Sequence, residues 1–124
     1  MTDRRAIINI KPEGDHAVKF ETSTTVSQLP IQIFRFPLTK QEQARLFRLR
    51  KTDPIGAALI SDLSKVEGIA TAEVPMVHEV HITLNKTHFW EDLTVQNAII
   101  PLLKLAVGRS LETDAEHVTI ATLG

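Results

Sequence analysis

The sequence predicts an α+β fold, because it contains both hairpin-like pairs of β-branched runs and capped helices with apolar stripes. One strand pair is indicated near the N-terminus and another over residues 69–84. Two short helices are expected between these pairs, and a longer apolar helix is expected after them. With 124 residues, the chain (1–124) is expected to form a single domain that buries about two-thirds of its unfolded surface.

The first predicted element is a β-hairpin. Residues 6–11 are apolar and β-branched, residues 12–15 supply a turn, and residues 16–21 alternate apolar with charged side chains. Val18 and Phe20 share one face of the second strand, and charged residues share the other. The hairpin is therefore expected to place one face on the core and one in water.

A third strand and a first helix are expected next. Residues 31–36 form an extended segment between Pro30 and Pro37, and these prolines favour an edge position because proline cannot donate to a ladder. Thr39 and Glu42 have the spacing of a capping box, in which the Thr39 hydroxyl accepts from the Glu42 amide and the Glu42 side chain reaches back.

The first helix is expected to end near Lys51, since Asp53 and Pro54 begin a second one. Asp53 is a favoured N-cap, and Pro54 is tolerated at the first helical position but bends the chain before it. Gly68 is predicted as the C′ residue that ends this helix. Its predicted apolar stripe consists of Ile55, Ala58, Leu59, Leu63 and Val66.

The second half of the chain predicts two paired strands, a helix and a last strand. Residues 69–74 and 77–84 are expected to pair through Pro75-Met76. A helix lies within Trp90–Val107 and should end at Gly108, well buried because its centre is apolar almost all round. Residues 111–116 read as a polar linker and residues 117–123 as a terminal strand.

Composition excludes several classes of function. The chain has no cysteine, so disulfides, thiolate nucleophiles and Cys-ligated zinc or iron–sulfur clusters are excluded. The formal net charge of -1 provides no long-range field for nucleic acid, so nucleic acid is not expected as a partner. No targeting segment and no apolar run of about 20 residues is found. A cytoplasmic protein without a cofactor is expected.

Histidines and a carboxylate on the strand over residues 77–84 are candidate reactive groups. His78 and His81 are three apart, so they point to opposite faces of a strand and are not expected to share a metal. We expect a half-buried His78 and a solvent-facing His81. Glu79 and His81 share a face and provide the weakest hypothesis, a small hydrolase, but no nucleophile motif accompanies them.

A basic cluster on the first helix is the most prominent charge feature. Arg45, Arg48, Arg50 and Lys51 alternate with apolar residues, and cations favour the C-terminal end of a helix even without a ligand. If the cluster is functional, Arg45, Arg48 and Lys51 are expected to dock an acidic protein surface. The alternative is a small domain that binds a small molecule or nucleic acid through this helix.

Several motifs resemble, in order, the N-terminal domain of Nfu-type (NifU-like) iron–sulfur scaffold proteins. They are Val18-Lys19-Phe20, Asp53-Pro54-Ile55-Gly56, Val66-Glu67-Gly68-Ile69, Ile82-Thr83-Leu84-Asn85-Lys86 and the Trp90-x-x-Leu93 helix opening. The resemblance covers a core of about residues 6–108, whereas residues 24–51 look like an addition. These 124 residues contain no counterpart of the Cys-x-x-Cys domain that holds the cluster in full-length family members.

This resemblance implies an α+β fold with an antiparallel sheet of about four to five strands and helices packed on one face. It also implies a non-catalytic, protein-binding accessory role in iron–sulfur cluster maturation, without cluster ligands, metal or catalytic residues of its own. The expected partner is an iron–sulfur carrier or a client protein. The sequence does not determine the oligomeric state.

Overall fold

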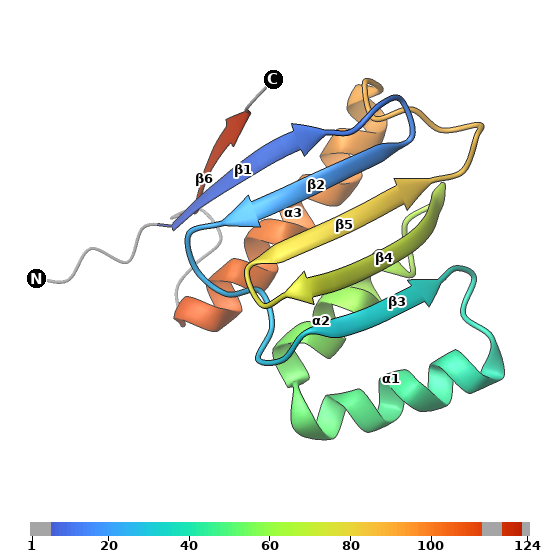
Figure 1. Ribbon diagram of the computed structural model, residues 1–124, viewed down its shortest axis with the longest axis vertical. Coiled ribbons are helices and arrows are strands. Elements are labelled where there is room, and N and C mark those ends of the chain that lie inside the picture. Colours follow the sequence, from blue (N-terminus) through green and yellow to red (C-terminus); the bar gives the residue numbers. More distant parts are fainter. Residues whose placement is uncertain (1–5, 113–117, 123–124) are drawn as a thin grey trace, which may run out of the picture.

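The computed structural model describes residues 6–112 and 118–122. Three helices and six strands are described within these ranges (Figure 1). In chain order they are β1 (Ala6–Pro12), β2 (Ala17–Thr22), β3 (Ile31–Arg35), α1 (Lys40–Thr52), α2 (Pro54–Leu63), β4 (Ile69–Met76), β5 (Glu79–Leu84), α3 (Leu93–Leu111) and β6 (Val118–Thr122).

The α+β prediction is confirmed, but the sheet is larger than expected and mixed. Its six strands run in the order β3-β4-β5-β2-β1-β6. Neighbouring strands are antiparallel except for β1 and β6, which are parallel. The predicted antiparallel sheet of four to five strands is therefore corrected to a mixed one of six. The parallel pair arises because α3 carries the chain along the sheet before β6 joins it, as parallel pairing requires a long connection.

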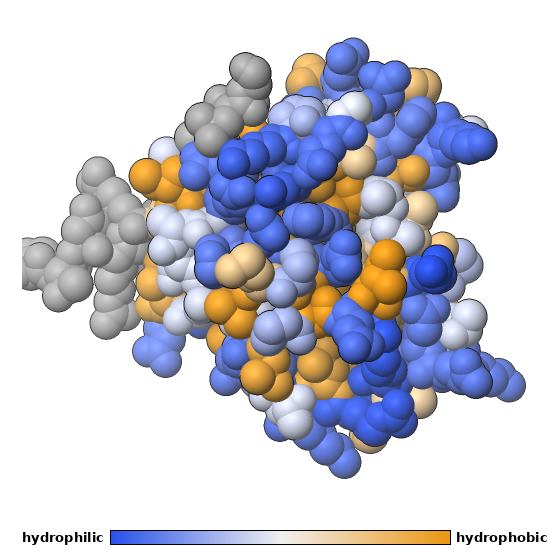
Figure 2. Space-filling view, viewed as in Figure 1, coloured by the Kyte–Doolittle hydropathy of each residue, from blue (hydrophilic) through white to orange (hydrophobic). Residues whose placement is uncertain are grey.

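The helices leave one face of the sheet open. In Figure 1, α2 and α3 lie side by side behind the sheet, and α1 lies beyond the edge strand β3, where it packs on α2. Helices on one face were expected, and α2 and α3 occupy that position. Figure 2 shows hydrophilic residues gathered over β1, β2 and β5 on the open face.

The predicted N-terminal hairpin is confirmed. Pairing of β1 with β2 places Ile10 opposite Phe20, and both side chains are buried. The rings of Phe20 and Trp90 pack in a T-shaped arrangement with their centroids 5.7 Å apart. This contact fixes the loop before α3 against the centre of the sheet.

Helix α2 begins as predicted and ends earlier. It runs from Pro54 to Leu63, whereas we expected it to reach Val66 and to be capped by Gly68. The amides of Lys65 and Val66 instead form tighter bonds to carbonyls three residues back, so the helix unwinds over one short turn. Gly68 has a φ of +95°, and a Cβ there would collide with the His88 ring, so glycine is required by that close approach.

The buried face of α2 is broader than the predicted stripe. Leu59 and Leu63 are buried as predicted, but Ile55 and Ala58 are only half-buried. The complete buried set is Gly56, Ala57, Leu59, Ile60 and Leu63. The difference arises because α1 and α3 flank α2 while β4 contacts it, so more than one face is covered.

The β4–β5 pair is confirmed, but its turn is displaced. Met76 pairs with Glu79, so Val77 and His78 form the turn instead of the predicted Pro75 and Met76. His78 is consequently exposed, which corrects the expectation that it is half-buried. Pro75 is accommodated by an irregular register between Glu73 and Met76.

Helix α3 is longer and less buried than predicted. It continues through Gly108 to Leu111, and the left-handed residue that ends it is Glu112, with φ 55°. Leu93 and Leu105 on its outer face are exposed, because only one face of α3 meets the sheet and α2. The predicted terminal strand is present as β6. His117, Leu123 and most of the predicted linker (113–116) lie outside the described residues.

Candidate functional site

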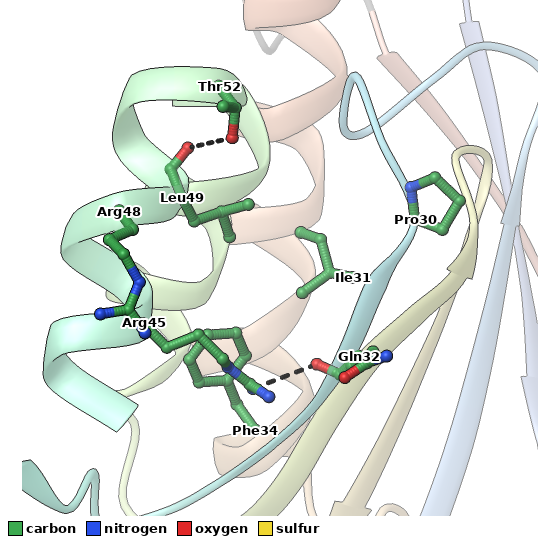
Figure 3. Close-up of a pocket in the computed structure, with 8 residues that line it drawn as sticks. All are labelled: Pro30, Ile31, Gln32, Phe34, Arg45, Arg48, Leu49 and Thr52. Carbon is green, nitrogen blue, oxygen red and sulfur yellow. Dashed lines mark hydrogen bonds between the residues drawn. The ribbon is translucent and has the colours of Figure 1, made fainter. Parts of the chain in front are cut away.

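A groove separates β3 from the C-terminal half of α1. It has a volume of about 300 Å³. Figure 3 shows its walls, with residues of β3 on one side and residues of α1 on the other. The groove is lined by Pro30, Ile31, Gln32, Phe34, Arg45, Arg48, Leu49 and Thr52. Two residues of the predicted basic cluster, Arg45 and Arg48, therefore line a concave and largely apolar surface.

Arg45 is bound within the domain. Its Nη2 donates to the carbonyl oxygen of Ile33 at 2.7 Å and to that of Gln32 at 3.3 Å. Its guanidinium lies 3.6 Å from the centroid of the Phe34 ring, within the range of a cation–π contact. Three β3 residues therefore hold Arg45, and its charge is less accessible to a partner than the sequence indicated.

Arg48 differs from Arg45 although it lies one turn further along the same helix. It is exposed, and no ion pair or hydrogen bond holds its guanidinium within the part of the chain that the structure describes. In Figure 3 the Arg48 side chain extends along the helix wall at the rim of the groove. Arg48 is therefore the cation best placed to meet a ligand in the groove.

Lys51 does not line the groove. Its Nζ lies 5.3 Å from the centroid of the Phe47 ring, and both residues are exposed. The structure thus brings Arg45 and Arg48 together at one site and leaves Lys51 on a neighbouring surface. Docking of a partner by all three residues together stays a prediction. Their positions favour Arg48 over Arg45 and Lys51 as the residue that meets the partner.

Glu42 has a role that the capping-box pattern did not predict. The Thr39 hydroxyl accepts from the Glu42 amide at 3.2 Å, as expected for an N-cap. The Glu42 carboxylate, however, accepts from the backbone amide of Arg35 at 2.8 Å and not from Thr39. The half of the box that required Glu42 to reach back is wrong, because β3 offers an amide on its outer edge.

The apolar lining was missed in sequence reasoning. Ile31 and Phe34 were recognised as strand residues and Leu49 as a helix residue, but nothing local shows that these two segments face each other. The flanking prolines were the available signal, since they indicated an edge strand that another element could cover. Figure 3 shows Phe34 beneath the Arg45 guanidinium, on the floor of the groove.

The open sheet face carries a ladder of paired charges. Lys11 and Lys19 contact Glu21 at 2.8 and 3.2 Å, and Lys19 also contacts Glu79 at 3.2 Å. The hydrogen bond from Lys11, followed by that from Lys19, holds the pKa of Glu21 below its usual 4.5. The hydrogen bonds to Glu21 and Glu79 raise the pKa of Lys19 above 10.5.

His81 completes this ladder. It faces the open side of the sheet, as expected, and is half-buried there, with ring nitrogens 3.3 Å from Glu79 and 3.7 Å from Glu73. Within the described residues, no group of three metal-ligating side chains is found, and His78 lies in the turn. Neither the groove nor a second cavity of about 440 Å³ beside Trp90 is lined by Glu79 or His81.

No protein-family model, curated protein or solved structure matches this chain. The likeness to the Nfu N-terminal domain therefore stays a prediction from the motifs. In the described part of the chain, none of the helices combines the length and apolar character needed to cross a bilayer.

Proposed function

We propose that this domain is a non-catalytic protein-binding module and that the groove between β3 and α1 is its docking site. The observation that carries the proposal is the position of Arg48, an exposed guanidinium without a counter-ion among the described residues, at the rim of an apolar groove. An apolar floor with a free cation at its rim suits a partner that combines an apolar side chain with a carboxylate.

The chemistry of the lining residues supports binding over catalysis. Acid–base and covalent catalysis require a titratable base or an activated nucleophile beside the substrate. The only hydroxyl of the lining belongs to Thr52, and it donates to the carbonyl oxygen of Leu49 at 3.3 Å. Neither a histidine nor a carboxylate lines the groove.

The setting that we propose is iron–sulfur cluster maturation in the cytoplasm, on the basis of the Nfu-like motifs. In this setting the domain contributes a docking surface, and the partner contributes the cluster ligands, because this chain has no cysteine to supply them. The partner is then an iron–sulfur carrier or an apo-client.

A small anionic molecule is the second candidate, favoured by one observation. The groove volume of about 300 Å³ lies at the lower limit of the range of small-molecule sites, roughly 300–1,000 Å³. Such a ligand would bind without any protein partner, which separates the two candidates experimentally.

Site-specific photocrosslinking tests the docking function. A photoreactive amino acid replaces Gln32, an exposed groove residue, and in a matched control it replaces Lys65, which is exposed after the end of α2. The probes are purified iron–sulfur carrier proteins and apo-clients. We expect covalent adducts from the Gln32 position only. Equal labelling from both positions, or none from Gln32, would contradict the docking function.

A further inference from the structure

The outer edge of β3 is closed to an incoming strand. Arg45 occupies the carbonyl oxygens of Gln32 and Ile33, and the Glu42 carboxylate occupies the Arg35 amide. At the start of the strand, Pro30 has no amide hydrogen to offer. An edge strand normally recruits a partner through these backbone groups. Side chains of α1 therefore occupy three backbone groups of β3, which opposes strand addition at this edge.

The groove accepts side chains instead of backbone. Its apolar lining includes Ile31, Phe34 and Leu49, and its volume of about 300 Å³ is large enough for one large apolar side chain of a ligand. An amphipathic helix fits such a groove by inserting one apolar anchor residue from its apolar face. This is a recurrent mode of peptide recognition.

Charge specifies the chemistry of that helix. Helix α1 carries five cationic side chains, Lys40, Arg45, Arg48, Arg50 and Lys51, and one acidic side chain, Glu42. Glu42 lies in the first turn of α1 and does not line the groove, so the groove rim keeps an excess of positive charge. Because the whole chain has a net charge of -1, the positive charge is concentrated at this element. The complementary partner is acidic.

We propose that the occupant of the groove is an acidic amphipathic helix of a partner protein, with one apolar anchor and a carboxylate one turn away that pairs with Arg48. This inference rests on the proposed docking function and adds its mode and its partner chemistry. The apolar anchor fills the space over Phe34 and Leu49. The carboxylate and the Arg48 guanidinium supply orientation and salt sensitivity.

Selection from a displayed library of random peptides tests the inference. The peptides are about 15 residues long, because shorter helices are marginal in water. Selection uses the full chain alone, so that peptides that bind independently of Arg48 are kept. We expect enriched peptides with apolar residues at helical spacing, an acidic residue one turn from the anchor, and increased helicity in circular dichroism on binding.

Two variants provide the controls for the affinity measurement. Arg48→Glu is expected to weaken the binding of an enriched peptide about tenfold. Arg50→Glu, on exposed surface outside the groove, is expected to weaken it less than about threefold. Both variants are checked for unchanged circular dichroism. Enriched peptides that are neutral, or that bind with alternating side chains as a strand, overturn the inference, as does the absence of any enriched peptide.

These outcomes are distinct from failure of the docking function itself. Adducts from Gln32 together with neutral or extended selected peptides would support docking in the groove and contradict an acidic helix as its occupant. Absence of Gln32 adducts would contradict the proposed docking function, whatever the peptide selection shows.

Discussion

The carboxylate of Asp53 accepts the backbone amide of Gly56 at 2.9 Å, at the point where α1 ends and α2 begins. Asp53 is completely buried, and it also accepts the amides of Gln28 and Leu29 at 2.9 and 3.1 Å. One side chain thus joins the loop before β3 to the α1–α2 corner. It positions both walls of the docking groove relative to each other.

Replacement of Asp53 by alanine is expected to destabilise the fold strongly. Three amides lose their acceptor, one of them in a buried hydrogen bond and two in half-buried ones, so the free energy of unfolding should fall by about 3 kcal/mol or more. Asp92→Ala is the matched control, because Asp92 is an exposed N-cap that accepts one amide, from Thr94. Its expected loss is about 1 kcal/mol. Equal losses in chemical denaturation would show that burial of Asp53 is unimportant.

Gly56→Ala is expected to destabilise the protein, although alanine is more favourable than glycine inside a helix by about 1 kcal/mol. A Cβ at Gly56 would lie 2.5 Å from Asp53 Oδ2 and 2.7 Å from Ile31 Cδ1. We expect a net loss of about 1–3 kcal/mol in denaturant titration. The exposed α3 position Asn97→Ala should change the free energy of unfolding by less than about 0.5 kcal/mol. A more stable Gly56→Ala protein would disprove the close approach.

Arg45→Ala is expected to open the edge of β3. The carbonyl oxygens of Gln32 and Ile33 lose their donor, and Phe34 loses the cation above its ring. We expect lower stability, by about 1–3 kcal/mol, and concentration-dependent self-association in light scattering. Arg50→Ala, exposed on the same helix, should remain as stable and as monodisperse as the unchanged protein. If both variants behave alike, Arg45 does not protect the edge.

Stability is expected to depend on pH through Glu21 and Lys19. The lowered pKa of Glu21 means that its contribution is present above its unfolded pKa and is lost as the pH falls below about 4.5. The raised pKa of Lys19 means that its contribution is present below 10.5 and is lost as the pH rises through the folded value. Glu21→Gln should flatten the acid limb of the unfolding profile, whereas the exposed Glu67→Gln should not.

The contacts of the predicted docking residues determine which charge reversals leave the fold intact. Arg45 binds β3, so its reversal to glutamate is expected to destabilise the fold. Reversals at Arg48 and Lys51 are expected to be structurally silent.

Local signals in the sequence predicted most of the elements. The N-caps Thr39 and Asp53 and the alternation in β2 and β5 depend on neighbouring residues, and each is found in the structure. The predicted end of α2 was wrong because Gly68 is required for a close approach to His88, which is a contact between distant parts of the chain. The parallel β1–β6 pair had no local signal at all.

The candidate site was predicted only in part for the same reason. Charge density on α1 is visible in the sequence, and it identified Arg45 and Arg48. Which of them is free depends on β3, since Arg45 bonds to residues twelve and thirteen positions away along the chain. Tertiary contact therefore decides which cation is available to a partner.

The docking groove is tested most directly by the dissociation constant of a partner captured through Gln32, measured at low salt for three proteins. These are the unchanged protein, Arg48→Glu and Arg50→Glu. We predict that Arg48→Glu weakens binding about fivefold or more and that Arg50→Glu has a much smaller effect, because Arg48 lines the groove and Arg50 does not. Equal dissociation constants for the two variants would contradict docking in the groove.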